Sequence, residues 1–181
     1  AIRSHGLDIL PWSDAVLALR GRLAWLNATL GDPWPDMSDE ALLDGLDDWL
    51  APFLPGDASL SAISGDRLKN ALLSRVPFEL QREIDRLAPS RFTLPTGNSA
   101  ALDYREKDVV LSARVQELFG LKAHPAIAGG KVPLLVELLS PAHRPIQTTR
   151  DLPGFWAGSW ADVRAEMRGR YPKHVWPENP A

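Results

Sequence analysis

Residues 91–113 read RFTLPTGNSAALDYREKDVVLSA, and this stretch marks a change in the hydrophobic pattern of the chain. Short runs of β-branched and aromatic residues are separated there by Pro, Gly and Asn, which is typical of strands joined by tight turns. Two further runs of this kind follow at 132–139 and 145–149. With one short helix expected near 115–119, the second half predicts a small, mostly antiparallel sheet.

Helical patterning returns at the C-terminal end of the chain. The sequence predicts a short helix through Phe155-Trp156 and a longer one over 160–170, supported by Asp162 in the manner of a capping box. The expected capping residues are Thr149 or Asp151 for the first helix and Ser159 for the second. The inward stripe of the longer helix is predicted to be Trp160, Val163, Met167 and Tyr171.

The first half is predicted to be all-helical, because its apolar residues recur at three- and four-residue steps. Ser13 and Ser38 suit N-caps, since a serine hydroxyl accepts a hydrogen bond from the free amides of the first turn. The first helix is expected to end at Gly31 and the second to run on to Pro55-Gly56. Two more helices are expected at 66–76 and 77–87.

The fold class is therefore α+β, with a helical module at 1–90 and an α+β module with a basic C-terminal helix at 91–181. Residues 1–90 carry 8 Lys and Arg against 14 Asp and Glu, a net −6. Residues 91–181 carry 12 against 9, a net +3. This asymmetry makes the second module the better candidate for contact with a polyanion, although two solvated faces would give the same counts.

Composition excludes several classes of protein. The 181 residues include no cysteine, which excludes disulfides, cysteine-ligated metal centres and thiol nucleophiles. No apolar run is long enough for a membrane span or a signal peptide core. We therefore expect a cytoplasmic protein without a membrane partner.

A search for catalytic motifs finds none. Asp39-Glu40 opens an amphipathic helix, whereas the metal-binding aspartate of an NTPase ends a buried strand. Gly129-Gly130 predicts a hairpin turn, and the following Lys131 lacks the rest of a phosphate loop. No serine sits in a nucleophile elbow. The four histidines, which lie far apart without ligand-like spacing, are His5, His124, His143 and His174. We predict no catalytic residue and no metal site.

The remaining candidate is a basic segment near the C-terminus. Arginine pairs bidentately with phosphate, and exposed aromatic rings stack on unpaired bases. The segment is therefore a candidate binding site for single-stranded nucleic acid, although its arginines could instead be ion-paired and its aromatic residues could be core. Arg164 and Arg168 are expected to share one helix face. The candidate nucleic-acid-binding residues are Arg144, Arg150, Arg164, Arg168, Arg170, Lys173 and His174.

The most specific stretch runs from Arg150-Asp151-Leu152 through Arg168-Gly169-Arg170-Tyr171-Pro172-Lys173-His174 to Trp176-Pro177. Shorter motifs agree in order upstream, among them Leu10-Pro11-Trp12-Ser13 and Glu137-Leu138-Leu139-Ser140-Pro141. Together they resemble the C-terminal domain of the HrpB family of bacterial DEAH-type ATP-dependent RNA helicases, over nearly the whole chain.

The resemblance implies an accessory part of a larger helicase. ATP and Mg²⁺ would bind in motor domains of the parent chain, and this part would hold no cofactor. Its expected partners are single-stranded RNA or DNA, weakly bound, and the motor domains. The main alternative is a protein-interaction or scaffolding domain that uses Trp12, Trp34, Trp176 or the acidic surface of the helical module to contact the rest of the parent chain or another protein. A third hypothesis is hydrolysis by a pair of carboxylates converging in a pocket with displaced pKa values.

Overall fold

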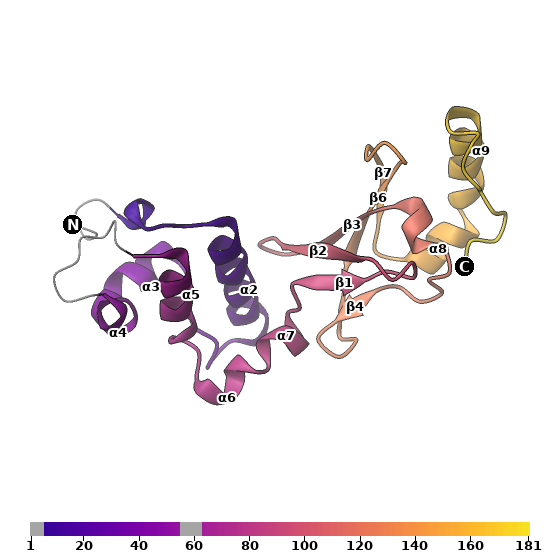
Figure 1. Cartoon of the computed structure of the whole chain (residues 1–181). Coiled ribbons are helices and arrows are strands. Elements are labelled where there is room, and N and C mark those ends of the chain that lie inside the picture. Colours follow the sequence, from indigo (N-terminus) through magenta and orange to yellow (C-terminus); the bar gives the residue numbers. More distant parts are fainter. Residues whose placement is uncertain (1–5, 55–62) are drawn as a thin grey trace. The chain divides into compact units, whose positions relative to one another are not determined.

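The computed structural model describes residues 6–54 and 63–181. It divides into two compact units, which we call unit 1 (Ala1–Ala88) and unit 2 (Pro89–Ala181). Unit 1 is helical, and unit 2 contains both described sheets and two C-terminal helices (Figure 1). The fold is α+β, as the sequence predicts.

Unit 1 is built around α2 (Asp14–Leu30), which packs against α5 (Gly65–Leu73). The Ser13 hydroxyl accepts from the Val16 amide at the start of α2, which confirms the predicted cap. Ser38 caps α3 (Asp39–Asp44) in the same way through Ala41. The other helices of unit 1 within the described residues are η1 (Leu7–Ile9), α4 (Leu46–Trp49), η2 (Ala51–Phe53), α6 (Phe78–Gln81) and α7 (Ile84–Leu87).

Two predicted helices of unit 1 are interrupted. The helix expected from Ser38 breaks at Gly45, whose φ of −97° and ψ of 14° leave the helical region between α3 and α4. A side chain there would place its Cβ 3.1 Å from Nη1 of Arg75, so glycine makes room for this guanidinium. The helix expected at 77–87 is likewise split into α6 and α7. The predicted stop at Pro55-Gly56 lies outside the described residues.

The main sheet of unit 2 has five strands in the order β1-β2-β3-β6-β7. All neighbouring pairs are antiparallel except β3 and β6, which run parallel, with Leu111 beside Val136. A separate hairpin pairs β4 with β5 and turns through Gly129-Gly130, both at positive φ, which confirms the predicted turn. The strands are β1 (Arg91–Thr93), β2 (Ser99–Tyr104), β3 (Val109–Arg114), β4 (Ala126–Ile127), β5 (Val132–Pro133), β6 (Leu135–Leu139) and β7 (Pro145–Thr149).

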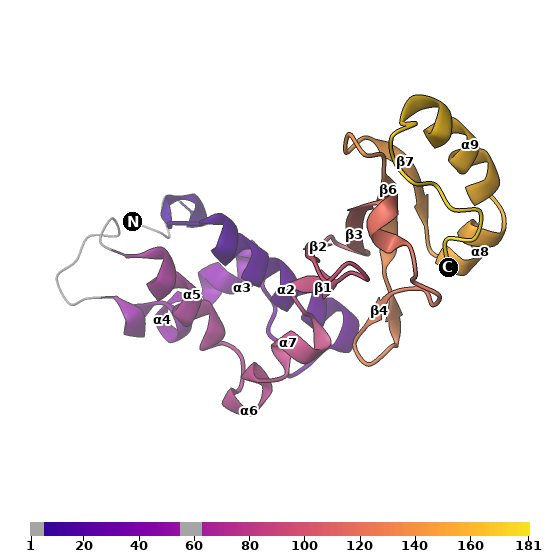
Figure 2. The same ribbon diagram turned by 45° about the vertical axis from the view of Figure 1, so that its right-hand side comes forward.

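Helices α8 (Leu152–Ala157) and α9 (Trp160–Arg170) lie on one side of the main sheet (Figures 1 and 2). The Asp151 carboxylate accepts from the Gly154 amide and caps α8. Ser159 makes no capping hydrogen bond to α9, contrary to the prediction, because its own backbone is already in the α region. An N-cap needs extended backbone to direct its hydroxyl at the first turn.

Candidate nucleic-acid interface

Aromatic side chains form the core between α8, α9 and the tail, the segment 171–181. Trp160 is 1% exposed, and its ring centroid lies 5.5 Å from those of Phe119 and Trp156. The Trp176 ring lies 6.3 Å from Trp160 and is also buried. Burial of Trp160 was predicted, whereas Tyr171 is only half-buried. These rings pack α8, α9 and the tail together, and α9 and the tail carry most of the predicted binding residues.

Hydrogen bonds from the helix side chains hold the tail against α9. Trp160 Nε1 donates to the Pro177 carbonyl at 3.0 Å, and Arg164 Nε donates to the Trp176 carbonyl at 2.7 Å. Trp176 Nε1 in turn donates to the Tyr171 carbonyl at 2.9 Å. The tail is therefore a fixed part of unit 2.

Arg164 and Arg168 differ in environment although they stand one turn apart on α9. Arg164 is half-buried and bonded to the tail, whereas Arg168 is exposed. The two residues share one helix face, as the sequence predicts, but they do not share an environment. The structure places Arg164 under the tail, because the chain folds back after Tyr171.

The same substitution at Arg164 and at Arg168 distinguishes the arginine that holds the tail from the exposed one. Arg164→Met is expected to lower the free energy of unfolding by about 1.5–3 kcal/mol, because it removes a charge-assisted hydrogen bond and leaves a carbonyl unpaired. Arg168→Met, the same change at an exposed position, is expected to stay within about 0.5 kcal/mol of the wild type. Urea unfolding of both variants measures the difference; equal losses would contradict the assignment.

Two further arginines of the candidate set have carboxylate neighbours. Arg150 Nη2 lies 2.8 Å from Oδ1 of Asp108, which precedes β3. Arg170 Nη1 lies 3.5 Å from Oε1 of Glu166, and its guanidinium carbon is 5.8 Å from the centroid of the Tyr171 ring. Exposed ion pairs of this kind are weak, so both cations stay available for exchange with phosphate.

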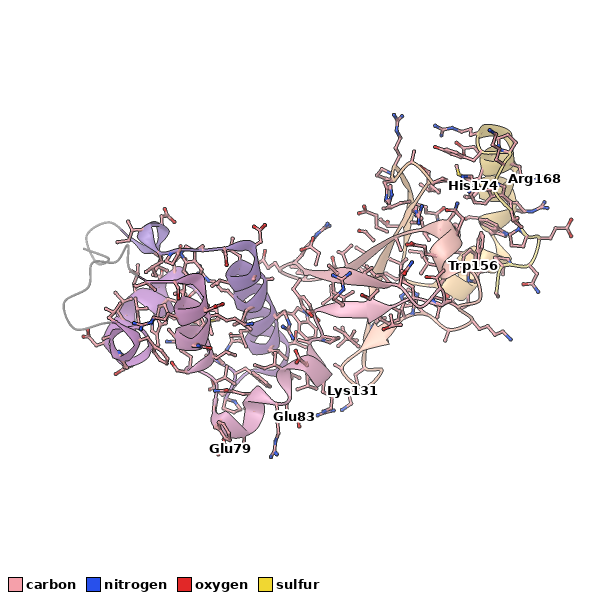
Figure 3. The ribbon with its side chains drawn as sticks, viewed as in Figure 1. Glu79, Glu83, Lys131, Trp156, Arg168 and His174 are labelled. Atoms are coloured by element: carbon pink, nitrogen blue, oxygen red, sulfur yellow. The ribbon has the colours of Figure 1, made fainter. Side chains whose placement is uncertain are left out.

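Arg168, Lys173 and Arg144 are exposed, and within the described part of the chain no side-chain hydrogen bond or ion pair engages them. Arg168 lies on α9 and Lys173 in the tail, while Arg144 lies in the turn between β6 and β7. Figure 3 shows Arg168 and His174 at the same end of unit 2, away from Lys131. We call Arg168, Arg170, Lys173 and His174 the tail cation set.

The tail cation set sits in a modest electrostatic field. Residues 160–181 carry four Lys and Arg side chains and three Asp and Glu side chains, a net +1 with histidine neutral. The acidic members are Asp162, Glu166 and Glu178. This balance limits the attraction of the segment for a phosphate backbone.

His174 is exposed and held in place by neighbouring rings. Its centroid lies 6.2 Å from that of Tyr171 and 6.1 Å from that of Trp176. Its Nδ1 lies 3.4 Å from Nε2 of Gln116, a residue of η4 (Val115–Leu118). Gln116 and Asp108 were not anticipated, since their positions beside His174 and Arg150 depend on long-range folding. The exposure of Val175, the residue after His174, was not anticipated either.

The two other hypotheses from the sequence are docking through exposed tryptophans and hydrolysis by a pair of carboxylates. Trp34 and Trp176 are buried, and Trp12 is half-buried beneath the Arg20 guanidinium, so these tryptophans do not form an exposed docking patch. Among the described acidic residues only Asp36 has a resolved pKa shift. Hydrogen bonds from Ser38, first from its backbone amide and then from its hydroxyl, lower the pKa of the Asp36 carboxyl group. Asp36 is exposed in a loop before α3.

The structure adds two findings about metals and membranes. Over residues 6–54 and 63–181, no cluster of three or more His, Asp or Glu side chains is arranged to hold a metal ion. None of the helices in those ranges combines the length and the apolar character that crossing a membrane would require.

Comparison with known proteins shows the class of this chain. Residues 49–180 match the family described as "ATP-dependent helicase C-terminal", HrpB_C. The chain belongs to this family, which confirms the resemblance seen in the sequence. It is therefore the C-terminal domain of an ATP-dependent helicase.

Three of the similar sequences and structures come from Escherichia coli and carry the name HrpB. The chain is 43% identical over 182 residues to the ATP-dependent RNA helicase HrpB of strain K12, covering 99% of this chain and 22% of that protein. The crystal structure of the E. coli DExH-box NTPase HrpB matches with a TM-score of 0.92 at 43% identity, over 99% of this chain and 22% of that one. That of the DEAH/RHA helicase HrpB matches with 0.78 at 40% identity, over 97% and 22%. The chain thus spans about a fifth of the length of these relatives.

Proposed function

We propose that unit 2 gives its parent helicase a weak accessory contact to single-stranded nucleic acid through the tail cation set. The observation that carries the proposal is the exposure of Arg168 and Lys173, which have no carboxylate partner among the described residues. Two such cations on a fixed segment can each hold one phosphate with little ordering cost. Arg170 can join them by exchanging Glu166 for phosphate.

The remaining predicted residues have different roles in this proposal. Arg164 acts by holding the tail, through its bond to the Trp176 carbonyl. Arg144 and Arg150, which lie at the two ends of β7, provide secondary contacts to a longer strand. The proposal therefore concentrates binding in the tail cation set.

In this proposal, the binding and hydrolysis of ATP take place elsewhere in the parent chain. We propose that ATP and Mg²⁺ bind in motor domains upstream and that the whole protein works in the cytoplasm. Support comes from the names of the relatives, an RNA helicase and an NTPase, and from the absence of cysteine.

We also propose that unit 1 docks on the motor domains of the same parent. The supporting observation is Phe78 at the start of α6, which is 85% exposed. Full exposure of a phenyl ring is costly in water and is relieved when a partner covers it. The flanking Glu79 and Arg82 are exposed and would lie at the rim of such a contact.

A titration of the 181-residue chain with a fluorescent single-stranded RNA of about ten nucleotides tests the nucleic-acid contact. With few phosphate contacts, the dissociation constant is expected to be micromolar or weaker and to rise as salt increases from about 50 to 200 mM. Fluorescence anisotropy measures both. Binding that is absent, or that does not respond to salt, would contradict the proposal.

A further inference from the structure

The exposed ring of His174 forms the outer end of a row of aromatic side chains. Trp176 is buried beside Trp160, and the His174 ring meets Trp176 at 59° and Tyr171 at 70°. The row thus begins in the core of unit 2 and reaches its surface at His174. Because both neighbours and the contact with Gln116 fix this ring, a ligand that stacks on it pays little ordering cost.

Val175, the residue after His174, adds an exposed apolar side chain to the tail. It is 81% exposed, which is unusual for a large aliphatic side chain on a segment whose neighbours are fixed by hydrogen bonds. Lys173, the residue before His174, is exposed and has no carboxylate partner within residues 6–54 and 63–181. The tail therefore presents an ammonium group, an aromatic ring and an isopropyl group at consecutive positions.

This succession matches the repeating chemistry of a single nucleic-acid strand. A nucleotide offers a flat apolar base and an anionic phosphate, and proteins that bind single strands pair aromatic rings with the first and cations with the second. A folded peptide segment would gain from Val175 but would have no particular use for a cation beside an exposed ring. The combination therefore favours a nucleotide.

We propose that His174 and Val175 form a stacking position for one unpaired nucleobase, and that Lys173 and Arg168 hold its flanking phosphates. The proposal rests on the proposed function and adds to it a contact with the base itself. Stacking is tolerant of sequence, because every base has a flat face. The position should therefore take any of the four bases.

Oligomers that carry the same charge but differ in bases provide the test. The probes are a single-stranded uridine RNA of about ten nucleotides and an abasic ribose-phosphate oligomer of equal length, each titrated by anisotropy against the whole chain. The wild type is expected to bind the uridine oligomer about tenfold more tightly than the abasic one. His174→Ala should reduce this preference to near unity, and His174→Phe should restore it.

His174→Ala also removes the contact with Gln116 and could unfold the protein. A second variant therefore keeps the test decisive if His174→Ala does not fold. Val175→Asn keeps the size of an exposed side chain and removes its apolar character, and should reduce the preference partly. Thermal unfolding of each variant checks that unit 2 is intact. If His174→Ala is unfolded, the Val175→Asn result decides, and an unchanged preference there overturns the proposal.

The outcomes separate the two proposals. Equal, salt-sensitive binding of both oligomers by the wild type overturns the stacking position and leaves the phosphate contact standing. A base preference that survives His174→Ala in a folded protein also overturns it. Binding of neither oligomer at low salt overturns both proposals.

Discussion

Replacement of Trp160 by alanine is expected to lower the free energy of unfolding of unit 2 by about 3–5 kcal/mol. The indole is 1% exposed, contacts the rings of Phe119 and Trp156, and donates to the Pro177 carbonyl. The variant loses this buried area, leaves a cavity and frees one fixing point of the tail. For a unit of this size the midpoint of thermal unfolding should fall by more than about ten degrees.

Trp160→Phe is the matched control for this prediction. It keeps an aromatic ring in the cluster and removes only the indole hydrogen bond and part of the volume, so its loss should be clearly smaller. Calorimetry of the two variants gives the comparison. A loss below about 1 kcal/mol for Trp160→Ala would show that the aromatic cluster does not organise the tail.

The double substitution Arg168→Gln with Lys173→Gln is expected to remove most of the salt-sensitive binding of single-stranded RNA. Each phosphate contact to a single strand contributes about −0.7 to the slope of log affinity against log salt, so losing two should flatten the slope by about 1.4. At about 50 mM salt this corresponds to an affinity loss of roughly 10- to 100-fold. Anisotropy titrations at several salt concentrations measure the slope.

Lys107→Gln with Lys131→Gln provides a control with the same loss of charge. Both lysines are exposed in turns of unit 2, between β2 and β3 and between β4 and β5. The control should change the slope much less than the Arg168 and Lys173 pair does. Equal changes would mean that net charge, and not the tail cation set, determines binding.

Local signals in the sequence were sufficient for much of the fold. The serine caps of α2 and α3, the glycine turn between β4 and β5 and the buried stripe of α9 each depend on residues within a few positions of one another. The change from helical to strand-like patterning likewise depends on periodicity alone. These features could therefore be predicted without tertiary information.

Features set by distant contacts could not be predicted in this way. In the helix expected from Ser38, apolar residues recur at helical spacing from Leu42 to Phe53, on both sides of Gly45. This spacing does not show that Arg75 occupies the space beside that glycine. In the candidate site, Arg164 and Arg168 look equivalent on a helical wheel. Only the folding back of the tail distinguishes them, and the pairing of Arg150 with Asp108 has the same origin.

We propose that single-stranded nucleic acid contacts the end of unit 2 formed by α9 and the tail. Backbone amide chemical shifts of the isotope-labelled chain, recorded during titration with a uridine oligomer, test this claim residue by residue. We expect the shift changes to concentrate between Arg168 and Trp176, with smaller changes near Arg144 and Arg150. Changes confined to unit 1, or spread evenly over every exposed lysine and arginine, would contradict it.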